Sequence, residues 1–320
     1  MCVGLAGCGV SYPSRPIDSA YLIGPSRPVD SAYLIGANGL EYAEAGLALS
    51  DIEDQKISVT VARFLRDSQG NDTVVVISDE VVILPVGFTA YEARDMVITL
   101  DGETLTFVDG QATLESGQTV WGYLNYALAH SATGGLYTYG KYASPSEGEA
   151  IDTEGFFAIG FQTNPDDIVV LSGDATYLGS YYGYGQLLDA DGGVLNDELE
   201  TIGAITIEVD FNSASASGQL NGFFDPEDER DPYSMIFVDA TIDGNGFAAA
   251  PDMICEAGAH CKSATSLGAA FYGDAGAELS GVIGFDETIV LTDTDTTTRF
   301  IGAAGFSSTR EVTAVEVPAD

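Results

Sequence analysis

The stretch Ile205-Thr-Ile-Glu-Val-Asp-Phe211 alternates apolar and polar residues from its first position. Successive side chains of a β-strand point to opposite faces, so its two isoleucines and its valine share one face, while the threonine, glutamate and aspartate share the other. A strand with one apolar and one polar face is typical of an antiparallel sheet that covers a core and faces water. The stretch therefore predicts the wall of a water-facing β-barrel.

Strands with similar signals lie on both sides of this stretch. They are expected at 155–162, 173–187, 203–211, 216–224, 233–242, 267–272, 278–285 and 298–306. Eight strands at this spacing suit a closed barrel, because closure leaves no strand edge unpaired. The predicted fold class is all-β: a filled eight-stranded antiparallel β-barrel, preceded by a smaller handle-like β region.

The handle-like region shows period-two patterning and short turns. Asp101-Gly102 and Asp109-Gly110 are two-residue connections that favour hairpins, so they predict a meander of three strands at 96–100, 103–108 and 111–115. The polar stretch 144–154 has no apolar period and marks a domain boundary. The expected organisation is a truncated lipoprotein leader and duplicated tether at 1–37, the handle at 38–150, the barrel at 151–310 and a tail at 311–320.

Four stretches of the second half combine glycines and aromatic residues in a fixed order. They are Gly173-Asp-Ala-Thr-Tyr-Leu-Gly179, the strand 205–211 followed by Ser217-Gly218, Phe271-Tyr-Gly-Asp-Ala-Gly-Ala-Glu-Leu-Ser-Gly281, and the segment 298–306. Together they resemble the β-barrel domain of the transferrin-binding protein B family of surface lipoproteins. The motif residues, for which we expect structural roles, are Gly173, Tyr177, Gly179, Asp210, Phe211, Phe271, Tyr272, Gly273, Gly276, Glu278 and Gly281.

Two features of this resemblance limit what it implies. Gly276 stands where the family usually has alanine, and the chain has room for one handle and one barrel, whereas the large family members carry two such lobes. The loops that grip transferrin have no residue-by-residue match here. The resemblance therefore implies the fold and a surface location, and not the host ligand. Glu278 is expected to cap a turn or accept hydrogen bonds from backbone donors; the alternative is a catalytic carboxylate.

The N-terminus carries signals of lipid anchoring. Leu5-Ala6-Gly7-Cys8 resembles a bacterial lipobox, which predicts Cys8 as the lipidated residue. A full signal peptide also has a basic region and a longer apolar stretch, so we expect the true start codon to lie upstream. Residues 13–24 recur at 25–36 with one difference, and this proline-containing duplication predicts a tether.

Cys255 and Cys261 enclose five residues that include His260. Half of a zinc site is one interpretation, but structural zinc sites favour tighter cysteine spacing and a second ligand pair. A disulfide is the other interpretation, and it implies an oxidising, extracytoplasmic compartment.

Composition excludes some functions and leaves others open. A net charge of −38 repels polyanions, so we expect no nucleic-acid partner. With two histidines and no nucleophile elbow, the chain is predicted not to be an enzyme, with no cofactor and no metal. We expect a non-catalytic lipoprotein at the cell surface or in the periplasm that binds an unknown protein or solute, in iron or other nutrient acquisition. The alternatives are an integral outer-membrane barrel of eight strands and a structural envelope protein.

Overall fold

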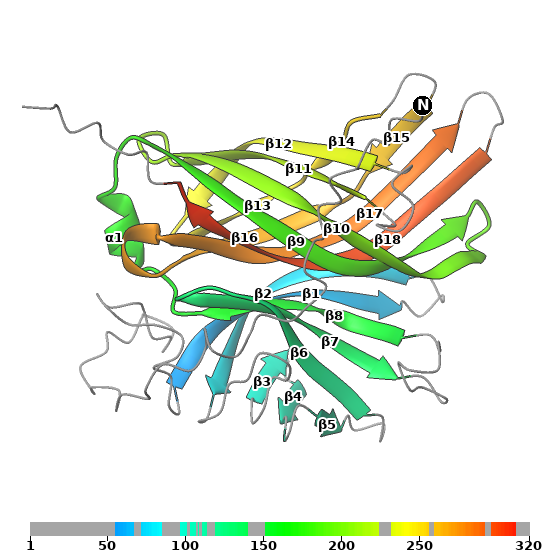
Figure 1. Ribbon diagram of the computed structural model, residues 1–320, viewed down its shortest axis with the longest axis horizontal. Helices are drawn as coiled ribbons and strands as arrows, with labels where there is room; N and C mark the ends of the chain where they lie inside the picture. The colour runs from blue at the N-terminus through cyan, green and yellow to red at the C-terminus, as the bar shows by residue number, and fades with distance from the viewer. Residues whose placement is uncertain are drawn as a thin grey trace, which may run out of the picture.

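A computed structural model describes residues 55–66, 72–84, 97–100, 103–106, 108, 111–113, 119–139, 151–223, 232–255, 259–291 and 296–311. Nearly all of these residues lie in antiparallel strands, and the described part contains one short α-helix, α1 (Pro165–Val169). Two β-structures lie against each other: a barrel and a curved sheet (Figure 1). The predicted all-β class is therefore confirmed.

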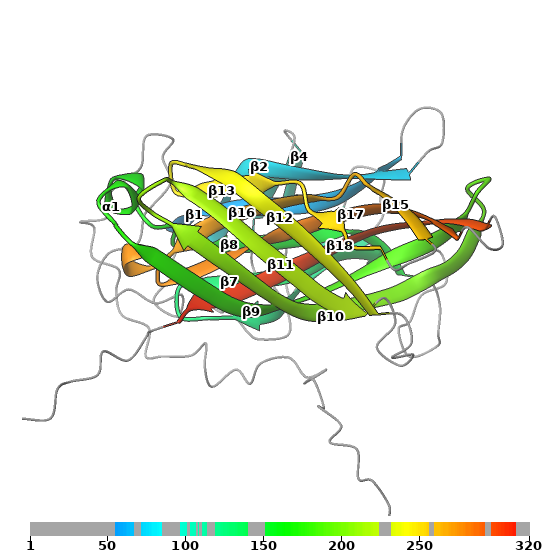
Figure 2. The ribbon, with the colours of Figure 1, turned by 90° about the horizontal axis from the view of Figure 1, so that it is seen from above.

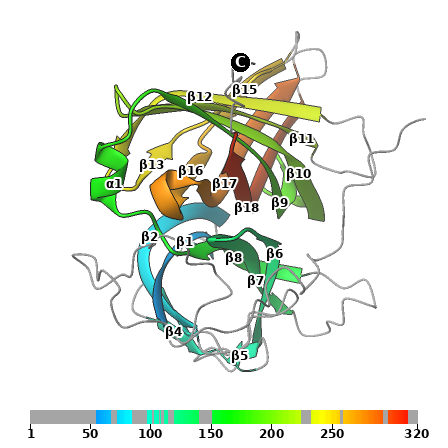
Figure 3. The same cartoon turned by 60° about the vertical axis from the view of Figure 1, so that its left-hand side comes forward.

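The curved sheet comes from the first half of the chain. Its strands are β1 (Gln55–Arg66), β2 (Asp72–Leu84), β3 (Val97–Leu100), β4 (Glu103–Thr106), β5 (Gln111–Thr113), β6 (Thr119–Ala127), β7 (Ser131–Tyr139) and β8 (Ile151–Gly160). Their order is β4-β3-β2-β1-β8-β7-β6-β5. The sheet curls beneath the barrel (Figure 3). The expected first hairpin is present, since Leu100 pairs with Glu103, and the described residues of the second are joined by a bridge between Val108 and Gln111.

The barrel comes from the second half. Its strands are β9 (Asp174–Asp189), β10 (Val194–Asp210), β11 (Ser215–Phe223), β12 (Pro232–Asp243), β13 (Gly246–Ala249), β16 (Ser266–Tyr272), β17 (Glu278–Leu291) and β18 (Thr296–Arg310). The circle closes because β11 pairs with β12 and β18 pairs with β9. Two short strands, β14 (Asp252–Met253) beside β12 and β15 (Ala259–Ser263) beside β17, continue its wall. The long strands run obliquely across the barrel (Figure 2). The closed eight-stranded barrel is thus confirmed.

Membership of the barrel differs from the prediction at one strand. The segment 155–162, expected as the first barrel strand, lies mostly in β8, which pairs with β1 and β7 of the curved sheet. The expected boundary at residue 151 is therefore wrong, and the barrel strands begin at Asp174. Its eighth place is taken by β13, a four-residue strand that the sequence pattern missed. Period-two patterning identifies a buried strand, but its sheet partner depends on contacts with distant segments.

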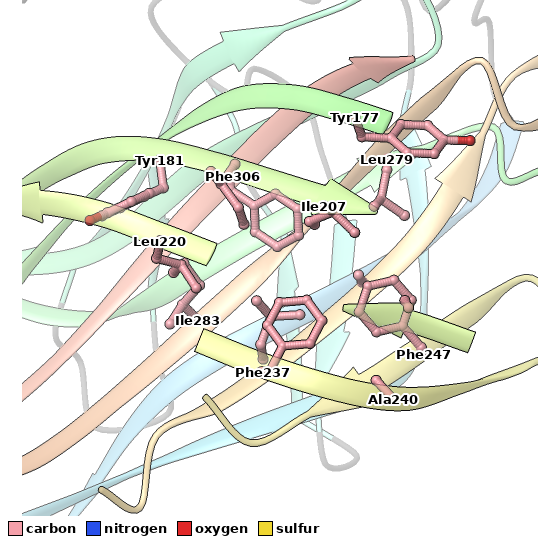
Figure 4. Close-up of a cluster of buried hydrophobic side chains, with 14 of the residues drawn as sticks. Tyr177, Tyr181, Ile207, Leu220, Phe237, Ala240, Phe247, Leu279, Ile283 and Phe306 are labelled. Carbon is pink, nitrogen blue, oxygen red and sulfur yellow. The ribbon is translucent and has the colours of Figure 1, made fainter. Parts of the chain in front are cut away.

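Side chains fill the barrel (Figure 4). Its inward face includes Tyr177, Tyr181, Phe285, Phe300 and Phe306, all fully buried. Their rings lie at centroid distances typical of tilted aromatic pairs, such as 5.7 Å between Phe285 and Phe300. The interior is therefore a packed core, as expected for a filled barrel.

Strand β17 belongs to both packing layers because its residues alternate. Ile283 and Phe285 point into the barrel core, whereas Val282 packs against Phe156 and Ala158 of β8. The curved sheet therefore covers one side of the barrel and is joined to it by a small apolar cluster and by the polar contacts described next.

Candidate functional site

Most of the motif residues gather at one end of the barrel, next to α1, which we call the α1 end. Tyr177 lies there in β9, and its hydroxyl donates a hydrogen bond of 2.6 Å to the carbonyl of Gly276. Its ring lies 5.8 Å from that of Phe271. Burial raises the pKa of Tyr177 to about 12, so the hydroxyl remains a neutral donor. Tyr177 therefore holds the turn that closes this end.

That turn requires glycine at its two ends. The 3₁₀ turn η4 (Asp274–Gly276) begins after Gly273, whose φ is +74°, and Gly276 has φ +66°. A Cβ at Gly273 would lie 2.4 Å from Cδ2 of His130. Left-handed backbone favours glycine, which suits both positions.

Glu278 connects the barrel to the curved sheet. It starts β17, and only 4% of its surface is exposed. Its carboxylate accepts hydrogen bonds from the backbone N–H of His130 (3.1 Å) and the Ser131 hydroxyl (2.8 Å). Ser280 lies 2.8 Å from the same serine hydroxyl. Burial raises the pKa of Glu278, while the hydrogen bond from Ser131 opposes the rise.

This geometry defines the role of Glu278. Both carboxylate oxygens are engaged by donors from the β6–β7 turn, so the group acts as an acceptor between two sheets. The histidine beside it contributes its backbone N–H to this arrangement. We call Glu278, His130, Ser131 and Ser280 the sheet–barrel clamp. The clamp accounts for the glutamate of the motif as a structural residue.

The remaining motif residues of this end support the turns around the clamp. The Asp210 carboxylate accepts from the backbone N–H of Asn212 (2.8 Å) and from the Ser213 hydroxyl (2.7 Å), and these bonds lower the pKa of Asp210. The Phe211 ring lies 5.8 Å from Phe271. The guanidinium group of Arg310 lies over the Phe211 ring, 5.5 Å from the ring centroid.

Three motif glycines and one tyrosine have simpler roles. Gly173 precedes β9 with φ +80°. A Cβ at Gly179 would lie 2.1 Å from the carbonyl of Ser307, and one at Gly281 would lie 2.0 Å from the carbonyl of Gly268, so neither position has space for a side chain. Tyr272 is fully buried, and burial raises its pKa.

The opposite end, which we call the hairpin end, carries the β9–β10 hairpin and the Cys255–Cys261 disulfide. The two cysteines are bonded, with Cα atoms 5.9 Å apart. Among the described residues, no group of three or more histidine, cysteine, aspartate or glutamate side chains is arranged to hold a metal ion. The structure therefore supports the disulfide interpretation of Cys255 and Cys261.

Sequence reasoning missed Glu287, a fully buried glutamate on the inward face of β17 near the disulfide. Its Oε1 contacts the hydroxyls of Ser263 and Thr265, and its Oε2 has no hydrogen-bond partner. Burial raises the pKa of Glu287 to about 7. The hydrogen bonds from Ser263 and Thr265 lower this pKa, while the charges of Asp286 and Asp252 raise it. Glu287 lies two residues after Phe285, in a strand whose odd-numbered residues face the core. This position is the sequence signal that indicates its burial.

Apolar side chains are exposed at both ends of the barrel. Val194 and Leu195 at the start of β10 are 56% and 57% exposed, and Ile254 beside the disulfide is 51% exposed. At the α1 end, Val169 and Val170 are 79% and 77% exposed. Consecutive exposed apolar residues of this kind are candidates for contact with another protein.

Several predicted features lie outside the described residues. They are the lipobox with Cys8, the duplicated tether, the first residues of the handle and the end of the tail. Within the described part of the chain, no helix is long and apolar enough to cross a membrane.

A closed antiparallel barrel whose end is tied to a curved sheet defines the architectural class. Residues 170–308 match the family model for the C-lobe and N-lobe β-barrels of transferrin-binding protein B. This part of the chain is therefore similar to the β-barrels of transferrin-binding protein B, as the motifs predicted.

Solved structures of transferrin-binding protein B are similar to this chain at low identity. A mutant of the Haemophilus parasuis protein is 17% identical, with a TM-score of 0.43, and the match covers 81% of this chain and 45% of that one. The isotype 1 protein from serogroup B Neisseria meningitidis is 16% identical, with a TM-score of 0.42 and coverage of 81% and 44%. The chain spans less than half the length of these proteins. No curated protein matches its sequence.

Proposed function

We propose that this protein is a non-catalytic lipoprotein of the cell envelope that binds a protein partner through its outer surface. The observation that carries the proposal is the filled barrel. Aromatic rings pack from Phe271 at the α1 end to Phe300 toward the hairpin end, so the interior is occupied by the protein's own side chains. A partner recognised at the surface fits this architecture better than a solute held inside the barrel.

The hairpin end is the proposed binding surface. The motif residues of the α1 end are engaged in the turn and the sheet–barrel clamp, whereas Val194, Leu195 and Ile254 expose apolar surface at the other end. Asp189 and Asp191 lie in the β9–β10 turn beside them. Apolar contacts bordered by acidic groups favour a protein partner with a basic rim.

The outer wall of the barrel supports a water-facing protein. On neighbouring strands, Glu208, Gln219 and Asn221 are exposed on the outer face. An integral outer-membrane barrel carries an apolar band on that face. The wall therefore favours anchoring through lipidated Cys8, with residues 13–36 as the tether, over insertion of the barrel itself. The disulfide is consistent with an extracytoplasmic location at the cell surface or in the periplasm.

Iron acquisition is the specific process that we propose, because the barrel matches those of proteins named for binding transferrin. The chain starting after Cys8, immobilised and free of lipid, would be tested by biolayer interferometry against iron-loaded and iron-free human transferrin. Capture from the growth medium, followed by mass spectrometry, would run in parallel. Saturable binding of either kind is the expected result. Absence of saturable binding in both assays would favour the structural envelope alternative.

A further inference from the structure

The hydroxyl of Ser263 lies in a contact network with more acceptors than hydrogen atoms. Ser263 Oγ lies 2.7 Å from the carbonyl of Pro251 and also contacts Glu287 Oε1. Thr265 Oγ1 contacts the same carboxyl oxygen and accepts the backbone N–H of Asp286 (3.1 Å). Ser263 and Thr265 therefore supply two hydroxyl hydrogens for three oxygen–oxygen contacts, so one hydrogen is lacking.

A proton on Glu287 completes this network. If the carboxyl donates to Ser263, the serine donates to Pro251 and the threonine donates to the carboxyl, so that every contact has one hydrogen. The fully buried Oε2, which has no partner, is tolerable as a neutral carbonyl oxygen, whereas an ionised carboxylate there is costly. The geometry alone thus favours the neutral acid.

We propose that Glu287 is a proton-controlled latch that holds the disulfide corner of the hairpin end closed when it is protonated and releases it when it ionises. The disulfide corner consists of residues 251–255 and 259–266. Ser263 links the two halves through its bond to Pro251, and Glu287 on β17 contacts both Ser263 and Thr265, the residue before β16. Ionisation makes water entry favourable, and water reaches the carboxylate when this corner separates from β17.

The surrounding groups reinforce this behaviour. Asp252 of β14 and Asp286 of β17 both disfavour the charged form, and Asp286 is itself paired with Arg299 of β18 through two bonds of 2.7 and 2.8 Å. Burial raises the pKa of Tyr233 of β12 and the charge of Glu287 raises it further, so this residue faces Glu287 as a neutral phenol.

The size of the effect follows from proton linkage. An open state with the ordinary pKa of 4.5 and a closed state with a pKa of about 7 differ in bound protons between these values. The opening equilibrium constant then rises as pH rises, by about 25-fold between pH 5.5 and pH 8, and levels off above that range.

Hydrogen exchange of the full-length protein tests the latch. Protection factors of the amides in 259–266, corrected for intrinsic exchange at each pH, should fall by about 25-fold between pH 5.5 and pH 8 in the wild-type protein. Glu287→Gln keeps the shape and removes the titration, so its protection should not vary with pH. Glu278→Gln, a buried glutamate on the other face of β17, is the matched control and should retain the wild-type dependence.

A second measurement covers the case in which Glu287→Gln does not fold. Infrared difference spectra of the wild-type protein should show the band of a protonated, buried carboxylic acid at pH 5.5 that is lost by pH 8. Protection that is independent of pH in the wild-type protein, a pH dependence retained in Glu287→Gln, or absence of that infrared band would overturn the latch.

Discussion

Glu278 accepts hydrogen bonds from an adjoining sheet while 4% of its surface is exposed, and this combination gives it a large expected effect on stability. Replacing it with alanine removes the acceptor of the His130 N–H and of the Ser131 hydroxyl, and leaves Ser131 with Ser280 as its partner. The loss of a buried hydrogen-bond partner costs about 1–3 kcal/mol, so Glu278→Ala should lower the free energy of unfolding by about 3 kcal/mol. Chemical denaturation measures this change.

The matched control is Glu208→Ala on the exposed outer face of β10. It removes the same charge without a buried hydrogen bond, and its effect should stay within about 0.5 kcal/mol. Equal effects of the two substitutions would show that the clamp does not stabilise the protein.

The sequence predicted these residues better than it predicted their partners. The resemblance singled out Glu278 and Tyr177, and both are buried and hydrogen-bonded. Their partners Ser131 and Gly276 lie 147 and 99 positions away along the chain. Such contacts are set by the packing of segments far apart in the sequence, which the local pattern does not encode. Glu287 escaped prediction for the same reason, because it looks like any polar strand residue until Ser263 and Thr265 surround it.

At the scale of single elements, the disulfide joins the two sides of the turn between β14 and β15. Closing so short a loop should contribute about 2 kcal/mol to stability in the chain-entropy model. Cys255→Ser/Cys261→Ser should therefore unfold at lower denaturant concentration than the wild-type protein.

A reducing agent supplies the control for this prediction. It should lower the stability of the wild-type protein to that of the double variant and leave the variant itself unchanged. Two free thiols in the unreduced wild-type protein, detected by mass spectrometry after alkylation, would contradict the bond.

Strand patterns were sufficient for most barrel elements but not for their limits. The alternation in β10 and the Phe271–Gly281 motif predicted strands that are present. The segment that forms β8, in contrast, was predicted to belong to the barrel and lies in the curved sheet. Glycine and alanine dominate β13, so no apolar period marks it. Its position follows from pairing with β16, which only the three-dimensional arrangement supplies.

At the scale of the whole molecule, the C-terminal end of β18 makes a testable difference to the stability of the isolated barrel. A fragment of residues 161–311 keeps all of β18, including Ser308, whose hydroxyl donates to the carbonyl of Leu279 (2.6 Å), and Arg310. A fragment of 155–306 loses this end of the strand and its pairing with β9. The longer β18 should give a cooperative melt at a higher temperature, measured by circular dichroism. Equal melting temperatures would contradict the assigned closure.

The central claim is that the α1 end is structural and that the hairpin end binds a protein partner. Both ends carry a pair of consecutive exposed apolar residues, 56% and 57% exposed at the hairpin end and 79% and 77% exposed at the α1 end, which allows a direct comparison of the two surfaces. Val194→Ser/Leu195→Ser changes the hairpin end, and Val169→Ser/Val170→Ser changes the α1 end. None of these side chains is part of the core, so both variants should retain the wild-type melting temperature.

The decisive measurement is the affinity of both variants for the partner captured by the wild-type protein, determined by biolayer interferometry at one salt concentration. We predict at least tenfold weaker binding for Val194→Ser/Leu195→Ser, since hot-spot truncations cost about 1.4 kcal/mol or more, and wild-type affinity for Val169→Ser/Val170→Ser. Loss of binding in the α1-end variant with full binding in the hairpin-end variant would contradict it.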